Sequence, residues 1–134
     1  MKDDTPYETW GYFIEQLQQK HPNLAYIHMV EPRTDLFGEA NAVTEDSLDP
    51  FCEKWSGVFI AGGGYSYSPK LAREVADSTG NLIAFGRTYT SNPDLVERLK
   101  NDWPLTPYDR STFYTNHTGT KGYNDWTNYS IEAQ

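Results

Sequence analysis

Three glycines and one Gly-Arg pair are the residues whose types and spacing favour binding of an anion. The glycines occupy positions 62–64, directly after the apolar run at residues 57–61, and Gly86-Arg87 follows the apolar run at residues 82–85. Consecutive glycines leave backbone N–H groups open to close approach, and a guanidinium binds an oxyanion through two hydrogen bonds. Each feature alone has an ordinary explanation, a flexible turn or a surface salt bridge. Because they end consecutive strands of the expected sheet, together they predict a phosphate site.

Arg33 is a third candidate, which could neutralise an anionic substrate or an electron-rich ring. It follows the apolar run at residues 24–30, and alternation along a strand places Glu31 on its side and His28 on the other. An ion pair with Glu31 or Asp35 explains the arginine equally well from spacing alone. His28 is expected to face the helices as a core histidine rather than to act in catalysis.

The sequence offers little for metal or cysteine chemistry. It contains no HExxH motif, no CxxC pair and no similarly spaced ligand cluster, so a metal site is not expected. Cys52 is the only cysteine, which excludes an internal disulfide, and no evident base would make it a nucleophile. With no apolar stretch like that of a signal peptide at the N-terminus, the expected compartment is the reducing cytoplasm.

The charge balance narrows the choice of partners. The 134 residues include 11 Lys and Arg against 19 Asp and Glu, a net charge of −8. This average charge repels a phosphate backbone, so no nucleic-acid partner is expected. No apolar run approaches the roughly 20 residues that span a bilayer, so no membrane partner is expected either. A small-molecule substrate is the expected ligand.

The elements that must position these residues alternate between helix and strand. Apolar spacing and Pro/Gly punctuation predict helices at about residues 7–20, 49–54, 69–78 and 92–101, and buried strands at residues 24–30, 57–61 and 82–85. Asn92 is expected to cap the last helix, with Pro93 in its first position. The length suits a single domain over residues 1–134, with an irregular tail from residue 102.

Three parallel strands raise a physical problem of their own. Their nearly continuous apolar runs require cover on both faces, and three strands are too few to close a barrel. As an open sheet they would expose two apolar edges. A second copy of the chain or another polypeptide is therefore expected to cover them.

Several segments resemble the old yellow enzyme family, and most closely its fungal branch. Residues 24–33 resemble the sixth barrel strand of that family, residues 86–95 its eighth strand and following helix, and residues 104–114 its C-terminal segment. The resemblance implies an α/β fold, a partial (β/α)8 TIM barrel corresponding to the last three strands and their helices. Members are FMN-dependent ene-reductases that use NAD(P)H to reduce activated C=C bonds, and several fungal members act in secondary metabolism.

The resemblance also assigns roles to matching positions. Arg33 matches an arginine that contacts the flavin ring, and Tyr114 a tyrosine near the substrate and the nicotinamide; these two are the candidate catalytic residues. The remaining candidates are expected to bind FMN, at its phosphate or, for the tyrosine, at the flavin edge: Gly63, Gly64, Tyr65, Gly86 and Arg87.

Three functions stay open because the earlier strands of such a barrel would carry the substrate-binding residues and the proton donor. The favoured function is FMN-linked reduction or isomerisation of an enone-like intermediate in fungal-type secondary metabolism, in a barrel completed by oligomerisation or another chain. The second is a cofactor-independent cyclase or isomerase on the same partial barrel, with Glu31, Arg33, Tyr65 and Tyr114 as candidate groups. The third is a non-catalytic oligomeric binding protein or a stable fragment of a longer product. Whether FMN is retained is left open.

Overall fold

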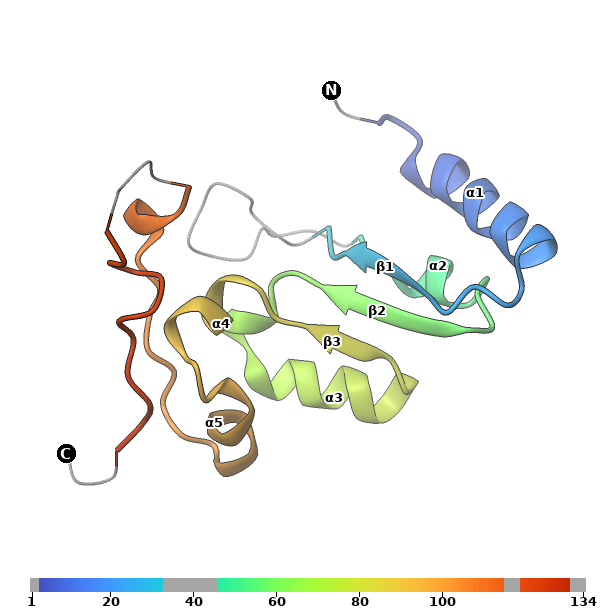
Figure 1. Ribbon diagram of the computed structural model, residues 1–134. Coiled ribbons are helices and arrows are strands. Elements are labelled where there is room, and N and C mark those ends of the chain that lie inside the picture. The colour runs from blue at the N-terminus through green and yellow to red at the C-terminus, as the bar shows by residue number, and fades with distance from the viewer. Residues whose placement is uncertain (1–2, 33–45, 115–118, 131–134) are drawn as a thin grey trace. The chain divides into compact units, whose positions relative to one another are not determined.

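The chain divides into two compact units, Met1–Ala84 and Phe85–Gln134. The computed structural model describes residues 3–32, 46–114 and 119–130 (Figure 1). The first unit contains, in chain order, α1 (Pro6–Lys20), β1 (Tyr26–Val30), α2 (Asp49–Cys52), β2 (Val58–Gly62), the 3-10 turn η1 (Tyr65–Tyr67), α3 (Pro69–Thr79) and β3 (Leu82–Ala84). The second contains α4 (Arg87–Ser91), α5 (Leu95–Asn101) and the 3-10 turn η2 (Arg110–Thr112).

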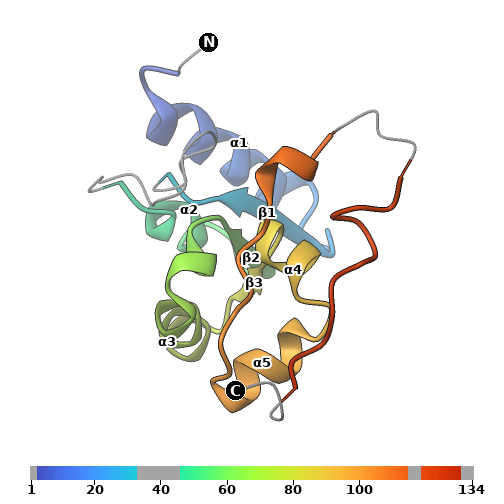
Figure 2. The ribbon, with the colours of Figure 1, turned by 90° about the vertical axis from the view of Figure 1, so that its left-hand side faces the viewer.

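The three strands of the first unit form one parallel sheet in the order β1-β2-β3 (Figure 2). Its register pairs Tyr26 with Val58 and His28 with Ile60, and Ile60 in turn with Leu82. The predicted parallel arrangement is therefore confirmed, and each strand lies within two residues of its expected bounds. Parallel strands place their carboxyl ends at one edge of the sheet, which is where the candidate residues of this unit follow.

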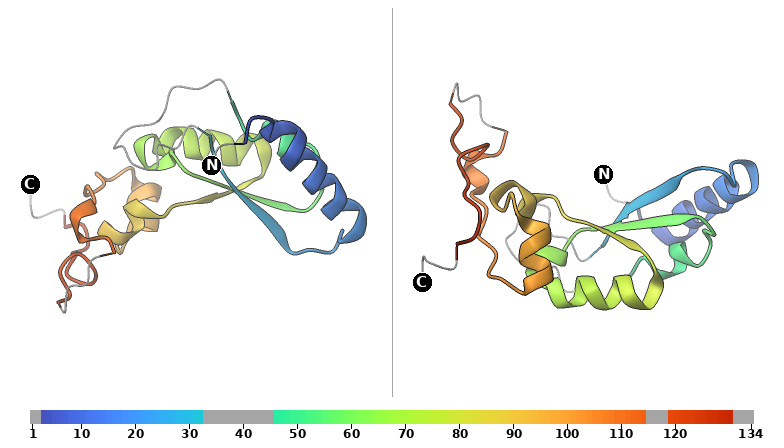
Figure 3. Two further views of the ribbon diagram at one scale, coloured as in Figure 1. Left: turned by 90° about the horizontal axis from the view of Figure 1, so that it is seen from above. Right: turned by 60° about the horizontal axis from the view of Figure 1, so that its bottom comes forward.

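The core of the first unit lies between one face of the sheet and the helices. Ile27, Phe59 and Ala61 are 8%, 3% and 2% exposed, and each follows a more exposed residue along β1 or β2. Helices α1 and α3 lie on one side of the sheet (Figure 3). Ile14 of α1 and Ala72 of α3 are buried with these strand residues.

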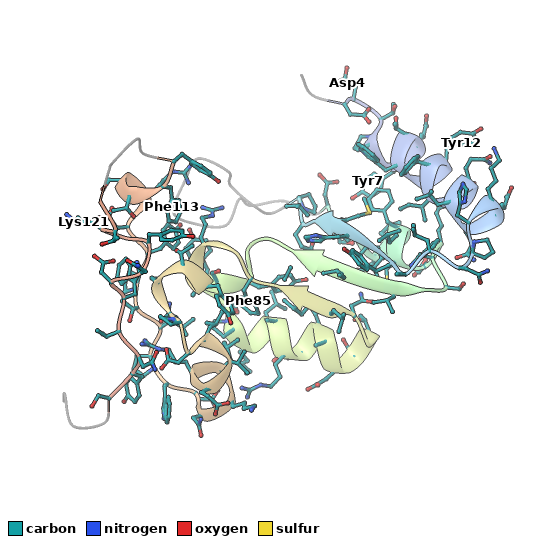
Figure 4. The ribbon with its side chains drawn as sticks, viewed as in Figure 1. Asp4, Tyr7, Tyr12, Phe85, Phe113 and Lys121 are labelled. Carbon is teal, nitrogen blue, oxygen red and sulfur yellow. The ribbon has the colours of Figure 1, made fainter. Side chains whose placement is uncertain are left out.

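A stacked aromatic pair joins α1 to α2. The ring centroids of Tyr7 and Phe51 are 5.4 Å apart, with 14° between their planes. In Figure 4 the Tyr7 side chain points from α1 toward the sheet side, whereas Tyr12 points away into solvent. The α1 helix starts with Pro6 in its first turn and ends with Lys20, close to the predicted 7–20.

The opposite face of the sheet, here called the open face, carries large side chains that are not covered by the described residues. Its members on the three strands include Tyr26, His28, Val30, Val58, Ile60 and Leu82. Four of these are large apolar residues with exposed fractions of 46% to 56%. Within the described residues the helices cover one face of the sheet, so the cover expected for the other face from a second copy or another polypeptide stays a prediction.

His28 is correspondingly not a core histidine. It lies on the open face and is exposed, and the side chain crosses over Gly62, where an added Cβ would come within 2.9 Å of His28 Nε2. The alternation that places Glu31 and His28 on opposite sides of the strand is right, since Glu31 is buried and His28 is exposed. The error concerns which of the two faces the helices cover.

The second unit departs from the predicted last helix. Asn92 follows α4, a five-residue helix that periodicity did not indicate, and α5 begins after Asp94 rather than at Pro93. Asn92 is fully buried and its side chain bonds other parts of the unit, as described below. In the described part of the chain, no helix is long and apolar enough to cross a membrane.

Because Ile27 is buried and Leu24 is exposed, truncating each to alanine should lower the free energy of unfolding by different amounts. Ile27→Ala removes a side chain packed beneath the helices and should lower the free energy of unfolding by about 2–5 kcal/mol. Leu24→Ala removes the same number of carbon atoms from a residue that is 44% exposed, and should cost no more than about 1 kcal/mol. Urea unfolding followed by circular dichroism measures both; equal costs would contradict the burial described.

Candidate functional site

The turn after β2 requires a backbone that glycine adopts without strain. Gly63 and Gly64 have φ angles of 92° and 74°, in the left-handed region. A side chain at either position would be strained there, so the sequence reaches this sharp turn with glycines. The turn connects the edge of the sheet to η1, which starts at Tyr65, and both glycines are half-buried.

Tyr65 follows the turn. Its ring is buried and its hydroxyl forms a hydrogen bond with Glu31, the residue after β1. Tyr65 is 1% exposed, and its hydroxyl donates to Glu31 Oε1 at 2.8 Å. The Glu31 backbone N–H donates to the Gly62 carbonyl at 2.7 Å, so the ends of β1 and β2 are joined by main chain and side chains together. Glu31 is 9% exposed, and a buried carboxylate needs such a donor. Whether Tyr65 also contacts a flavin edge stays a prediction.

Gly86 and Arg87 lie in the second unit, at the start of α4. A Cβ at Gly86 would meet no other atom within 4 Å, so the backbone here is accessible without any close neighbour. Arg87 is half-buried and its Nη1 donates to the Tyr108 hydroxyl oxygen at 3.2 Å. Its Cζ lies 5.8 Å from the centroid of the Tyr108 ring, a cation–π distance. Tyr108 was not predicted as a functional residue. It lies 21 residues after Arg87, so the contact between them follows from the fold and not from a local sequence pattern.

Of the two candidate catalytic residues, the structure describes only Tyr114. Arg33 lies outside the described residues. Tyr114 is fully exposed with a φ of 53°, and its ring meets Phe113 edge-on at 6.2 Å between centroids. The roles expected for both residues stay predictions.

A buried amide ties α4 to the segment after α5. Asn92 Nδ2 donates to the carbonyl oxygens of Thr88 and Thr106 at 2.8 and 2.9 Å, and Asn92 Oδ1 accepts from the Thr106 N–H at 2.8 Å. Ser91 Oγ donates to the same Thr106 carbonyl at 2.8 Å. Both residues are 0% exposed, so these bonds satisfy polar groups that water cannot reach. The backbone two residues before Tyr108 is thereby fixed.

A second buried group, the Arg98 guanidinium, donates hydrogen bonds to several residues of the tail. Its Nη1 donates to the Pro104 carbonyl at 3.0 Å and to Thr106 Oγ1 at 2.9 Å, and its Nη2 to the Thr127 carbonyl at 3.2 Å. Its Nε donates to Asp94 Oδ1 at 2.7 Å, with side chains only 4% and 13% exposed. A guanidinium suits this role because its five donors point in fixed directions.

Asp94 is held as a carboxylate by the groups around it. Burial acts to raise its pKa, but the N–H of Tyr129, 2.7 Å from Asp94 Oδ2, and the Arg98 guanidinium outweigh burial and lower the pKa below its ordinary 3.8. The Tyr129 ring in turn stacks on Trp103 with centroids 4.8 Å apart. The tail is therefore anchored to α5 by charge, hydrogen bonds and ring packing.

Each unit therefore carries part of the candidate set. Gly63, Gly64 and Tyr65 follow one another in the first unit, and Gly86, Arg87 and Tyr114 belong to the second. Among the described residues, no group of three or more His, Cys, Asp or Glu could hold a metal ion. Open glycine backbone and a guanidinium are donors to an anion, which is the chemistry that these residues offer.

Comparison with known proteins gives one family. Residues 1–106 match the model of the NADH:flavin oxidoreductase / NADH oxidase family. The 12-oxophytodienoate reductase 1 of Oryza sativa subsp. japonica is 42% identical over 124 residues, which cover 92% of this chain and 32% of the rice protein. The flavin oxidoreductase hxnT of Emericella nidulans is 36% identical over an alignment that covers 93% of this chain and 36% of that protein.

Solved structures agree with the sequence matches. The old yellow enzyme from Pichia sp. AKU4542 superposes with a TM-score of 0.72 at 35% identity, over 92% of this chain and 30% of the yeast enzyme. Morphinone reductase in complex with tetrahydroNAD superposes with a TM-score of 0.75 at 28% identity, over 99% of this chain and 33% of that structure. The chain spans about a third of the length of the curated relatives it matches.

The Asp94–Arg98 pair predicts an acid-sensitive second unit. Because the folded pKa of Asp94 is lowered, its contribution to stability is present above the unfolded pKa and is lost as the pH falls through the folded pKa. Asp94→Asn leaves Arg98 buried without its carboxylate and should cost about 3–5 kcal/mol near neutral pH. The variant should also lose the acid dependence that the wild-type carboxylate contributes.

Urea unfolding, repeated from neutral pH down to about pH 2, measures both effects. Glu74→Gln is the matched control, because Glu74 pairs with Lys70 at 3.8 Å and both side chains are well exposed. The interpretation is wrong if Asp94→Asn costs no more than this surface control.

Proposed function

Because the chain belongs to the old yellow enzyme family of NADH:flavin oxidoreductases, we propose that it forms the phosphate-binding part of an FMN-dependent oxidoreductase. The observation that carries the proposal is the family match over residues 1–106, which includes both glycine segments and Arg87. Gly63, Gly64, Gly86 and Arg87 are the residues proposed to bind the FMN phosphate.

The described residues have the chemistry that a phosphate group needs. The left-handed backbone of Gly63 and Gly64 excludes side chains from the turn after β2. The space around Gly86 is open within its own unit, and Arg87 carries a guanidinium. Backbone N–H groups and a guanidinium are the donor types that bind phosphate oxygens. These properties, found separately in the two units, support FMN as the cofactor.

Bound FMN would supply hydride transfer from NAD(P)H to an electron-poor C=C bond, such as that of an enone. In this proposal the glycine backbone and Arg87 bind the phosphate, and Arg33 balances negative charge on the ring system. Tyr114 would contact substrate and nicotinamide, and Tyr65 the flavin edge. A place in fungal-type secondary metabolism is part of the proposal and is supported by the resemblance to the fungal branch.

A complete site also needs cover for the open face of the sheet. Four large apolar side chains of this face are about half exposed: Tyr26 (53%), Val30 (56%), Val58 (46%) and Leu82 (55%). Contact of such surface with water is energetically unfavourable. Among the described residues, β1 and β3 are the two edge strands of the sheet. We propose that additional strands of a (β/α)8 barrel, from a second copy or another polypeptide, pair with β1 and β3 and enclose this face.

Binding of FMN and riboflavin to the purified protein tests the function, because the two flavins differ by the phosphate. We expect the protein to bind FMN more tightly than riboflavin, measured by titration calorimetry and visible absorbance. Arg87→Ala should weaken FMN binding about 10- to 100-fold, the loss of a charged hydrogen-bond partner, and change riboflavin binding little. Arg73→Ala, at an exposed position of α3, is the matched control.

The same preparation distinguishes the remaining functions. Light scattering gives the mass of the assembly, and addition of NADPH under anaerobic conditions should bleach the flavin absorbance. A protein with no preference for FMN over riboflavin would contradict the proposal. Turnover of an enone without flavin would instead favour the cofactor-independent isomerase or cyclase.

A further inference from the structure

Within the second unit, the Arg87 guanidinium contacts a tyrosine from the tail. Arg87 Nη1 donates to Tyr108 Oη at 3.2 Å, and Arg87 Cζ lies 5.8 Å from the centre of the same ring. One tyrosine therefore contacts the guanidinium through both a hydrogen bond and its ring. A long arginine side chain otherwise has many rotamers, and ordering them opposes binding.

Tyr108 is itself held in place from two directions. Its ring stacks on Phe113, with centroids 5.5 Å apart and 23° between the planes. Figure 4 shows the Phe113 side chain in this part of the second unit. Two residues before Tyr108, the backbone of Thr106 exchanges hydrogen bonds with the buried Asn92 amide. The backbone that carries Tyr108 is therefore hydrogen-bonded to Asn92, the residue that follows α4.

We propose that Tyr108 is a positioning residue that orients the Arg87 guanidinium for the phosphate of the flavin. The proposal rests on the proposed function, because it assigns Arg87 to the phosphate. A guanidinium has five N–H donors, so a bond from Nη1 to Tyr108 is compatible with further bonds to phosphate oxygens. Tyr108 contributes by ordering the arginine before binding, which lowers the entropy lost when the phosphate is bound.

Two substitutions separate the two contacts of Tyr108. Tyr108→Phe removes the hydrogen bond and keeps the ring against Arg87, and should raise the Kd for FMN about three- to tenfold. Tyr108→Leu removes both contacts and should raise it about ten- to thirtyfold. Tyr123→Phe is the matched control, since Tyr123 is 86% exposed in the same unit, and should change it less than twofold.

The readout is the ratio of the Kd values for FMN and riboflavin, by titration calorimetry, with Arg87→Ala as reference. A merely structural tyrosine would weaken both flavins together, whereas a positioning residue changes only the ligand that carries a phosphate. Circular dichroism of each variant establishes that it is folded, and the phenylalanine variant keeps the test valid if Tyr108→Leu unfolds.

The outcomes distinguish this inference from the proposed function. The inference is supported when Arg87→Ala and Tyr108→Phe both lower the preference for FMN. It is overturned, with the proposed function intact, when Arg87→Ala lowers the preference and Tyr108→Phe behaves like Tyr123→Phe. A wild-type protein without any preference for FMN overturns both.

Discussion

The requirement that apolar surface be removed from water governs the first unit. Strands β1 and β2 bury Ile27, Phe59 and Ala61 beneath helices, and the pleat then turns the intervening side chains to the other face. Several of the side chains on that face are as apolar as the buried ones, as Val30, Val58 and Leu82 illustrate. A sheet of this composition is suited to a layer with cover on both sides, which is the arrangement that parallel strands generally have. The similarity to much longer old yellow enzymes accounts for such a composition.

The second unit is stabilised by different means. After Asn101, η2 is the only helix or strand among the described residues. No described apolar side chain after Asn101 is among the buried ones. Asn92 and Arg98 instead satisfy the backbone polar groups of the tail, which would otherwise need a sheet, a helix or water. A buried amide and a buried guanidinium thereby replace regular secondary structure as the source of fixed geometry.

Much of the fold could be predicted because local rules determine it. The apolar runs at β1, β2 and β3 and the prolines that open α1 and α3 gave bounds within about two residues of those observed. The alternation around Glu31 was also right. The covered face was wrong, because alternation groups residues into two faces without saying which face meets the helices, and His28 was assigned to the wrong one.

Long-range contacts explain what the sequence did not reveal. Asn92-Pro93 has the pattern of a helix start, yet the amide of Asn92 bonds to Thr106, which lies 14 residues later. The five residues of α4 are too few for a periodic signal. The glycines and Arg87 were identifiable from residue type and position, whereas Tyr108 was identifiable only from the contact that it makes.

The hydrogen bonds of Arg98 have a consequence for how the chain could be shortened. Its nitrogen atoms reach carbonyl groups at Pro104 and Thr127, so the irregular tail supplies the solvation of a cation that is 3% exposed. Removing the tail would leave Arg98 with its bond to Asp94 but without its other acceptors. The Asn92 amide would keep the Thr88 carbonyl and lose both bonds to Thr106, and water would have to replace what the tail supplied. A segment without regular structure is in this respect as indispensable as a core strand, and an excision boundary chosen at the end of α5 would be a poor one.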